Sequence, residues 1–332
     1  MHISKQIAAT VFALAACTAA AAAPDAGQFQ TPAAGTAFAP AVLTGAQEYR
    51  ITSRHTGKTY RIQVAALGDV PPGGYPVLYL LDGDIMFPAA LASAQNMTMR
   101  LEENNAVPML LVGVGYPGGQ FLDIPSRSDD YTPPSDSYAQ TGDKISKKFG
   151  GADAFRRFLT EELRSDLAAR FPVNRKQQNL FGHSYGGLFG LYTLLTRPES
   201  FRNYLIASPS VWWNKQRVGD FLPAFEKRMR QGGGVLPGVR LSVGAFEQAA
   251  VPYMKDSAKR NELLEKRGMV RNTEAVGRTL AALPGGKESV QTQVYPNDTH
   301  ASVVLPAIND GIRWLYARCK ADADCHRAKS AE

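Results

Sequence analysis

Short runs of apolar residues recur along the chain from residue 48 onward, and their pattern predicts a sheet. Residues 48–53 and 59–66 flank the turn His55-Thr-Gly-Lys58, which predicts a β-hairpin. Residues 290–295 alternate between apolar and polar positions and predict an outer strand. Five other short apolar runs are typical of buried parallel strands and cover residues 76–81, 107–114, 178–181, 204–207 and 239–243.

Helical periodicity separates these strands. Apolar side chains recur every three or four positions within residues 152–171, and residues 304–316 repeat the pattern. Strands that alternate with helices predict an α/β fold, a mostly parallel central sheet with helices on both faces. The segments 118–150 and 248–286 are longer than ordinary connections, so we expect them at the C-terminal edge of the sheet, where such folds bind ligands. We predict one domain over residues 46–318 with a decorated C-terminal rim.

The N-terminal residues have the three-part layout of a secretory signal. His2 and Lys5 precede an apolar run over residues 7–16, and small residues follow through Ala23. An A-x-A site ends at Ala22, which predicts a signal peptide over residues 1–22 and a flexible lead-in over 23–45. Leu-Ala-Ala-Cys17 also resembles a lipobox, in which the signal would cover residues 1–16 and Cys17 would carry a lipid anchor. Both alternatives predict a periplasmic or secreted protein.

Composition and charge narrow the classes of partner. The formal net charge is +7 and the isoelectric point about 9.2, yet lysines and arginines are dispersed rather than clustered. Nucleic-acid binding needs a basic patch, so we expect no nucleic-acid partner, only a general attraction for anionic ligands. After the leader, no apolar run approaches the ~18 residues of a transmembrane span.

The cysteines predict a disulfide near the C-terminus. Cys17 lies in the leader, which leaves Cys319 and Cys325 within the tail 319–332. In an oxidising compartment, this pair would close a small loop and stabilise the chain end by about 2 kcal/mol. No second Cys/His pair has ligand spacing, so we expect neither a metal site nor a cofactor.

The segment Gly182-His-Ser-Tyr-Gly186 fits the pattern G-x-S-x-G, with an apolar strand before it and a helical pattern after it. That context predicts a nucleophile elbow, in which a strained turn presents the hydroxyl of Ser184 and glycines avoid crowding. The alternative is a structural bend between strand and helix. A serine hydroxyl needs a base within hydrogen-bond reach.

Elimination selects the base. Four of the five histidines are poorly placed: His2 in the leader, His55 in the hairpin turn, His183 beside the nucleophile, and His326 after the second cysteine. His300 remains, after the last strand and before the C-terminal helix, where the order Ser, acid, His places the base.

The acid is less narrowly determined. Glu247 lies at the end of the strand predicted over residues 239–243, where the acid should orient the imidazole. Asp256 and Asp298 are alternatives, as is a Ser–His dyad without an acid. The oxyanion hole should combine the N–H of Tyr185 with that of Gly83 or Asp84, in the loop after the third strand.

These pieces together resemble an esterase family of α/β-hydrolases that includes esterase D-type enzymes, feruloyl esterases, enterochelin esterases and mycolyltransferases. The matching motifs run in family order through residues 45–318: YPVLYLLDGD (75–84), VGVGYP (112–117), RSDDYTPP (127–134), GHSYGG (182–187), SPSVWW (208–213), VGAFEQ (243–248) and NDTHASVVLPAI (297–308). The combination looks most like the periplasmic, enterochelin-esterase-like branch.

The resemblance implies an exported serine esterase with the α/β-hydrolase fold that acts through an acyl-enzyme on catecholate siderophores. Some members of that branch are thought to use a Ser–His dyad. Arg127 could attract an anionic ferric siderophore, or it could pair with Asp129 or Asp130. Trp212 and Trp213 could face an aromatic substrate or pack under the rim. Alternatives are a feruloyl, carbohydrate or general acyl esterase, a mycolyltransferase-like acyltransferase, and a non-catalytic binding protein, against which the intact Ser–His pair argues.

Overall fold

The structure, a computed structural model, describes residues 41–255 and 257–326. Every element below belongs to the unit that begins at Val42. The predicted leader, with His2 and Cys17, lies outside the described residues, and so does Asp256.

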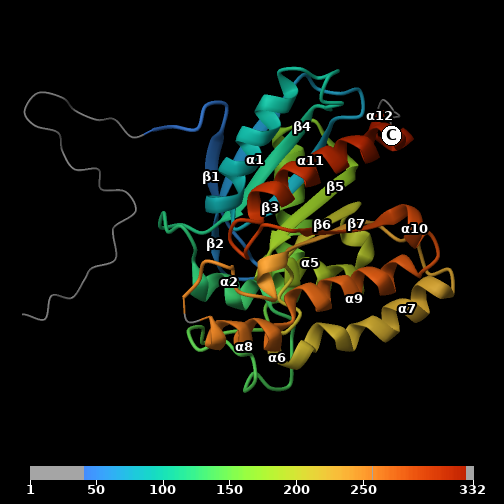
Figure 1. Cartoon of the computed structure of the whole chain (residues 1–332). Coiled ribbons are helices and arrows are strands. Elements are labelled where there is room, and N and C mark those ends of the chain that lie inside the picture. Colours follow the sequence, from blue (N-terminus) through green and yellow to red (C-terminus); the bar gives the residue numbers. More distant parts are fainter. Residues whose placement is uncertain (1–40, 256, 327–332) are drawn as a thin grey trace, which may run out of the picture. The chain divides into compact units, whose positions relative to one another are not determined.

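An eight-stranded sheet forms the centre of the described unit, with the order β1-β2-β4-β3-β5-β6-β7-β8 (Figure 1). β1 pairs antiparallel with β2 and β2 with β4, whereas all other neighbours are parallel. The strands are β1 (Gln47–Thr52), β2 (Thr59–Leu67), β3 (Tyr75–Leu81), β4 (Met109–Gly115), β5 (Val173–His183), β6 (Asn203–Ala207), β7 (Gly238–Gly244) and β8 (Val290–Tyr295).

Helices cover both faces of this sheet. α1 and α11 pack on one face with a buried cluster of their own, while the α3–α4 segment, α5 and α9 cover the other (Figure 1). The helices are α1 (Gly83–Thr98), α2 (Ile124–Tyr131), α3 (Ala152–Arg157), α4 (Arg164–Arg170), α5 (Tyr185–Thr196), α6 (Trp213–Gln216), α7 (Leu222–Arg230), α8 (Ala258–Arg267), α9 (Met269–Ala281), α10 (Gly286–Ser289), α11 (Val304–Ala321) and α12 (Ala323–His326).

The prediction of a mostly parallel α/β sheet is confirmed. The helix predicted over residues 152–171 is α3 and α4 joined by a π-helical turn, Phe158–Leu163. Its apolar face is buried because Phe155, Phe158 and Leu159 enter the cluster beneath the sheet. The pattern analysis did not identify α1, which contains Pro88.

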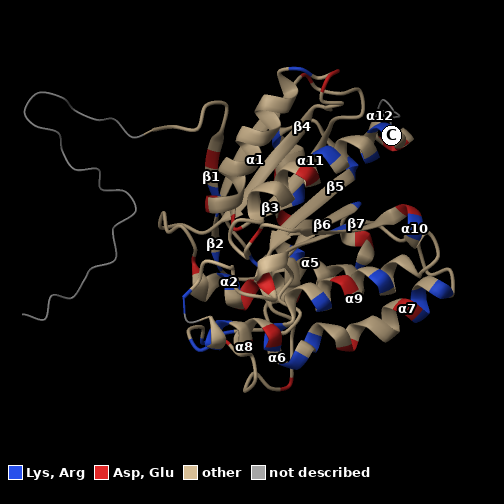
Figure 2. Ribbon diagram, viewed as in Figure 1, with Lys and Arg blue, Asp and Glu red and all other residues tan. Residues whose placement is uncertain are grey.

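Charged residues lie mainly on the helices and loops, and few lie on the central strands (Figure 2). β3 and β4 are buried at every position, which explains their continuously apolar sequences. A fully buried leucine or phenylalanine contributes about 1.5–3 kcal/mol of transfer free energy, so the two clusters supply most of the driving force for folding. None of the helices in the described part of the chain combines the length and apolar character that crossing a bilayer needs.

The C-terminal end of the described chain is hydrogen-bonded to β5 and to the residue before β6. Asp322 accepts hydrogen bonds from the side chains of Gln177 and Arg202. Cys319 and Cys325 have Cα atoms 5.4 Å apart, a separation that a disulfide spans.

The turn between β5 and α5 is strained and depends on glycine. Ser184 has φ 59° and ψ −115°, a conformation that costs of order 1–3 kcal/mol and must be held by its surroundings. Ser184 N–H donates to the carbonyl of Ala207 at 3.0 Å. A Cβ on Gly182 would lie 2.1 Å from the carbonyl oxygen of Gly186, and one on Gly187 would lie 2.7 Å from that of Ala207. Strand and helix therefore approach so closely that only glycine fits.

We predict that Gly182→Ala lowers the free energy of unfolding by about 1–3 kcal/mol, because the new methyl group must displace backbone atoms. Urea unfolding measures the change. Gly219→Ala is the matched control, since a Cβ there meets nothing within 4 Å, and it should change the same quantity by no more than about 0.5 kcal/mol. Equal stability of the two variants would contradict this account of the turn.

Candidate active site

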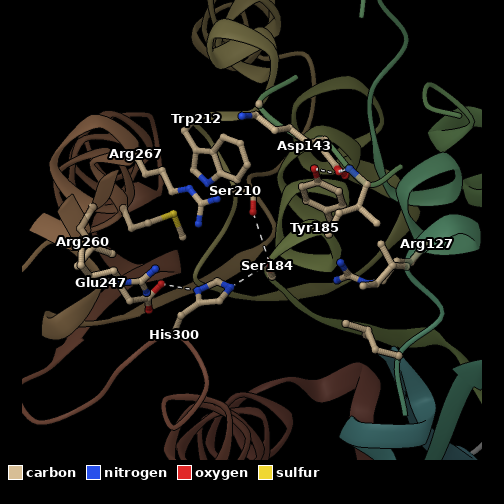
Figure 3. Close-up of a pocket in the computed structure, with 17 residues that line it drawn as sticks. Arg127, Asp143, Ser184, Tyr185, Ser210, Trp212, Glu247, Arg260, Arg267 and His300 are labelled. Atoms are coloured by element: carbon tan, nitrogen blue, oxygen red, sulfur yellow. Dashed lines mark hydrogen bonds and ion pairs between the residues drawn. The ribbon is translucent and has the colours of Figure 1, made fainter. Parts of the chain in front are cut away.

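Three side chains from the C-terminal ends of β5, β7 and β8 form one hydrogen-bonded chain (Figure 3). Ser184 Oγ lies 3.0 Å from His300 Nε2, and His300 Nδ1 lies 2.6 Å from Glu247 Oε2. Glu247 ends a short 3₁₀ helix, Ala245–Glu247, directly after β7. The structure thus brings together the residues that the sequence suggested as nucleophile, base and acid.

The second oxygen of Glu247 is held by donors that the sequence analysis did not identify. Oε1 accepts a hydrogen bond from Ser208 Oγ at 2.5 Å and another from the backbone N–H of Gly244 at 2.8 Å. The Glu247 side chain is 1% exposed, and these donors leave Oε2 to face His300. The only signal for Ser208 in the sequence was its place in the motif SPSVWW.

The rival Asp298 does not approach the imidazole through its side chain. Asp298 Oδ1 accepts a hydrogen bond from Ser302 Oγ at 2.6 Å, and its backbone carbonyl accepts one from Phe246 N–H. This residue shapes the loop that carries His300 and ties it to the loop of Glu247.

His183 packs against His300 and bonds its backbone. Burial, and then the neighbouring charge of His300, hold the pKa of His183 well below its usual value, so the ring is neutral. Its Nε2 lies 2.8 Å from the backbone carbonyl of His300, to which it donates. His55 instead pairs with Glu161 beside the hairpin.

Ser210 places a second hydroxyl beside that of Ser184, and the sequence analysis did not single it out. Its Oγ lies 3.5 Å from Ser184 Oγ, and its backbone N–H donates to the carbonyl of Ser184 at 3.2 Å. The segment after β6 therefore contacts Ser184 through Ser210 and Glu247 through Ser208.

The turn between β3 and α1 lies beside the elbow, as an oxyanion hole requires. A Cβ on Gly186 would lie 3.5 Å from Leu81 and 3.7 Å from Asp82. Tyr185 begins α5, and Gly83 begins α1, so their N–H groups have no partner inside those helices. The side chain of Asp84 pairs with Arg61, which leaves only its backbone N–H for this role.

A cavity of about 440 Å³ opens above Ser184. Residues from the two long segments form opposite walls, which agrees with the predicted decorated rim. Its floor contains Ser184, Ser210 and His300, and its walls are lined by Leu122, Ile124, Arg127, Gly142, Asp143, Lys144, Ile145, Tyr185, Trp212, Glu247, Arg260, Leu264, Arg267 and Met269.

Arg127 reaches the cavity, but its charge is already paired. Its guanidinium donates to both carboxylate oxygens of Asp82, at 2.8 and 2.9 Å. Burial opposes the charged form, yet the Asp82 carboxylate outweighs it and raises the pKa of Arg127. Pairing within its own loop was the alternative expectation, and it is wrong because Lys58 pairs with Asp129 and Asp130 instead.

The two tryptophans of the SPSVWW motif have different surroundings. Trp212 lines the cavity, with the Arg267 guanidinium 4.5 Å from its ring centre. Trp213 is fully buried and packs against Tyr138 and Phe149. The expectation that Trp213 contacts substrate is wrong, because its ring faces away from the cavity into the core.

This fold and this site define an ester-hydrolysing enzyme of the α/β-hydrolase type. The sequence profile of the family described as "Putative esterase" matches residues 53–238. The chain belongs to that family.

Curated relatives and solved structures support the assignment. The chain is 34% identical to a siderophore enterobactin esterase of Emericella nidulans, over 75% of this chain and 84% of that protein. It is 32% identical to the ferri-bacillibactin esterase BesA of Bacillus subtilis, over 68% and 78%. The siderophore hydrolase EstA from Aspergillus nidulans superposes with a TM-score of 0.73 at 29% identity, covering 85% of this chain and 99% of that one.

Proposed function

We propose that this enzyme hydrolyses the ester bonds of siderophores, with Ser184 as nucleophile, His300 as general base and acid, and Glu247 as the carboxylate that orients His300. The observation that carries the proposal is the continuous hydrogen-bonded chain Ser184–His300–Glu247, whose three residues all line the cavity. The substrate class rests on the similarity to siderophore esterases of a bacterium and a fungus.

The proposed reaction has two halves. Ser184 Oγ attacks the ester carbonyl carbon while its proton passes to His300 Nε2, and the N–H groups of Tyr185 and of Gly83 or Asp84 stabilise the oxyanion. The carbon–oxygen bond to the alcohol breaks, and His300 gives that oxygen the proton. Water then attacks the acyl-enzyme, loses a proton to His300 and releases the acid. Ser184 regains its proton as it leaves.

Glu247 suits the role of positioning the base. With Oε1 occupied by Ser208 and Gly244, Oε2 accepts from Nδ1–H, which leaves Nε2 without a proton and able to receive that of Ser184. The same carboxylate would stabilise the imidazolium that forms during attack.

Ser184→Ala should lower kcat by roughly 10⁴ or more, because residual activity would come only from binding and the oxyanion hole. His300→Ala should cost about as much, and the double variant little more, since the two residues act as one unit. The measurements are kcat on a p-nitrophenyl ester and release of the hydrolysed product from a catecholate siderophore. A Ser184→Ala protein that keeps a tenth of wild-type activity would overturn the mechanism.

Glu247→Gln should lower kcat by about 10⁴ if the carboxylate sets the imidazole tautomer, because the amide would present N–H to Nδ1. Asp298→Asn is the matched control and should change kcat less than about tenfold, since its side chain bonds only within the loop. Asp256→Asn is the third variant, and it should leave kcat close to that of wild type. Losses below tenfold for all three variants would indicate a Ser–His dyad, and a large loss for Asp256→Asn alone would move the acid to the rim.

We also propose that residues 1–22 are a signal peptide, that 23–45 form a lead-in to the catalytic domain 46–318, and that the mature protein is exported with Cys319 and Cys325 joined. Intact-mass measurement of protein from the periplasm should give a chain that begins at Ala23, two hydrogens lighter than the reduced form. A lipidated Cys17 would support the alternative anchored form. A retained leader or two reactive thiols would refute the export proposal.

A further inference from the structure

The cavity has an unequal distribution of charge around Ser184. Arg260 and Arg267 come from α8 and line one wall, whereas Arg127 lies across the nucleophile with Asp143 and Tyr185 (Figure 3). Arg127 is neutralised by Asp82. Within residues 41–255 and 257–326, Arg260 and Arg267 form no ion pair, although Arg271, just beyond α8, pairs with Glu265.

Arg267 is the more strongly held of the two. Its guanidinium lies over the Trp212 ring, and Trp212 is in turn packed against Gly142, where a Cβ would come within 2.9 Å of the ring. Stacking on an aromatic face removes water from that face of the guanidinium and leaves the N–H groups at its edge available.

The two arginines also act on each other. Burial, and then the charge of Arg260, lower the pKa of Arg267. Two like charges on one wall repel, and a bound anion would offset that repulsion.

Neither of the two carboxylates in the described lining, Glu247 and Asp143, supplies that anion. Glu247 is buried and bonded to Ser208, Gly244 and His300. Asp143 lies on the other wall and accepts from Tyr185 OH at 3.0 Å and from the backbone N–H groups of Ile145 and Ser146. Lys144, next to Asp143, is the fourth cation of the lining, after Arg127, Arg260 and Arg267.

We propose that Arg260 and Arg267, backed by Trp212, form an anion subsite that selects ester substrates with a carboxylate or phenolate oxygen in their acyl part. A guanidinium offers paired N–H donors in one plane, which match the two oxygens of a carboxylate or of adjacent phenolates. The subsite rests on the proposed function, because it assumes that the ester carbonyl sits at Ser184. It extends that function by assigning charge selection to α8 rather than to Arg127.

The test compares two esters that share the p-nitrophenolate leaving group, p-nitrophenyl valerate and mono-p-nitrophenyl glutarate. The acyl chains have the same length, and only the second carries a carboxylate. Arg267→Gln and Arg260→Gln should each lower the ratio of kcat/KM for the anionic to the neutral ester, and the double variant should lower it about tenfold or more, mainly through KM. Arg267→Lys should retain part of the ratio, because lysine keeps the positive charge but lacks the planar, paired N–H donors of a guanidinium.

Lys266→Gln is the matched control, since Lys266 is an exposed cation on the same helix that does not line the cavity. It should leave the ratio within about twofold of wild type. In wild type the ratio should also fall as salt rises from 0.05 to 0.5 M, because screening weakens attraction between charges.

The outcomes separate this inference from the proposed function. If the double arginine variant keeps the wild-type ratio, or loses no more of it than Lys266→Gln does, the anion subsite is refuted while the esterase proposal stands. If wild type hydrolyses neither ester nor any siderophore, the proposed function fails first.

Discussion

The arrangement of the site depends on one buried carboxylate, that of Glu247. A buried charge is costly unless each of its oxygens finds donors, and removing a donor can cost several kcal/mol. Here the donors come from Ser208 after β6, from Gly244 at the end of β7, and from His300 after β8. The three strand ends must therefore keep their mutual positions for the charge to stay satisfied. The arrangement of strand ends that gives Glu247 its hydrogen-bond donors therefore also points His300 at Ser184.

The strand order explains how this is achieved. β5, β6, β7 and β8 are consecutive neighbours and all parallel, so their C-terminal ends meet along one edge. The end of β6 and the residues after it contact both Ser184 and Glu247. Ala207 and Ser210 bond the backbone of Ser184, and Ser208 bonds Glu247. The strain at Ser184 is balanced by the same segment that anchors the acid. Chain positions 184, 247 and 300 become one site because the sheet brings their strand ends together.

The sequence predicted the parts of this site that have a local signature. Ser184 lies in G-x-S-x-G between strand and helix, His300 follows from elimination among five histidines, and Glu247 follows from its place after a strand. The sheet could be predicted because β3, β4 and β6 are buried at every position, which makes their sequences apolar. Ser208 could not, since one hydroxyl among many has no pattern until its partner is known. The difference between Trp212 and Trp213 also depends on tertiary packing, because adjacent residues share every sequence signal.

Charged residues were the hardest to assign, because their effect depends on partners far away in the sequence. Arg127 looked available for an anion, yet Asp82 binds it bidentately and begins the turn into α1 in the left-handed conformation, φ 52°. Removing Arg127 would leave the Asp82 carboxylate buried without its cation, next to Gly186 of the elbow. Its geometry therefore suits fixing the turn that carries Gly83 and Asp84. Arg260 and Arg267 came from a helix that looked like an ordinary charged surface, and yet they reach the cavity. In the proposed scheme, Arg260 and Arg267 attract the anion and Arg127 holds the turn of Gly83 and Asp84, on opposite sides of Ser184.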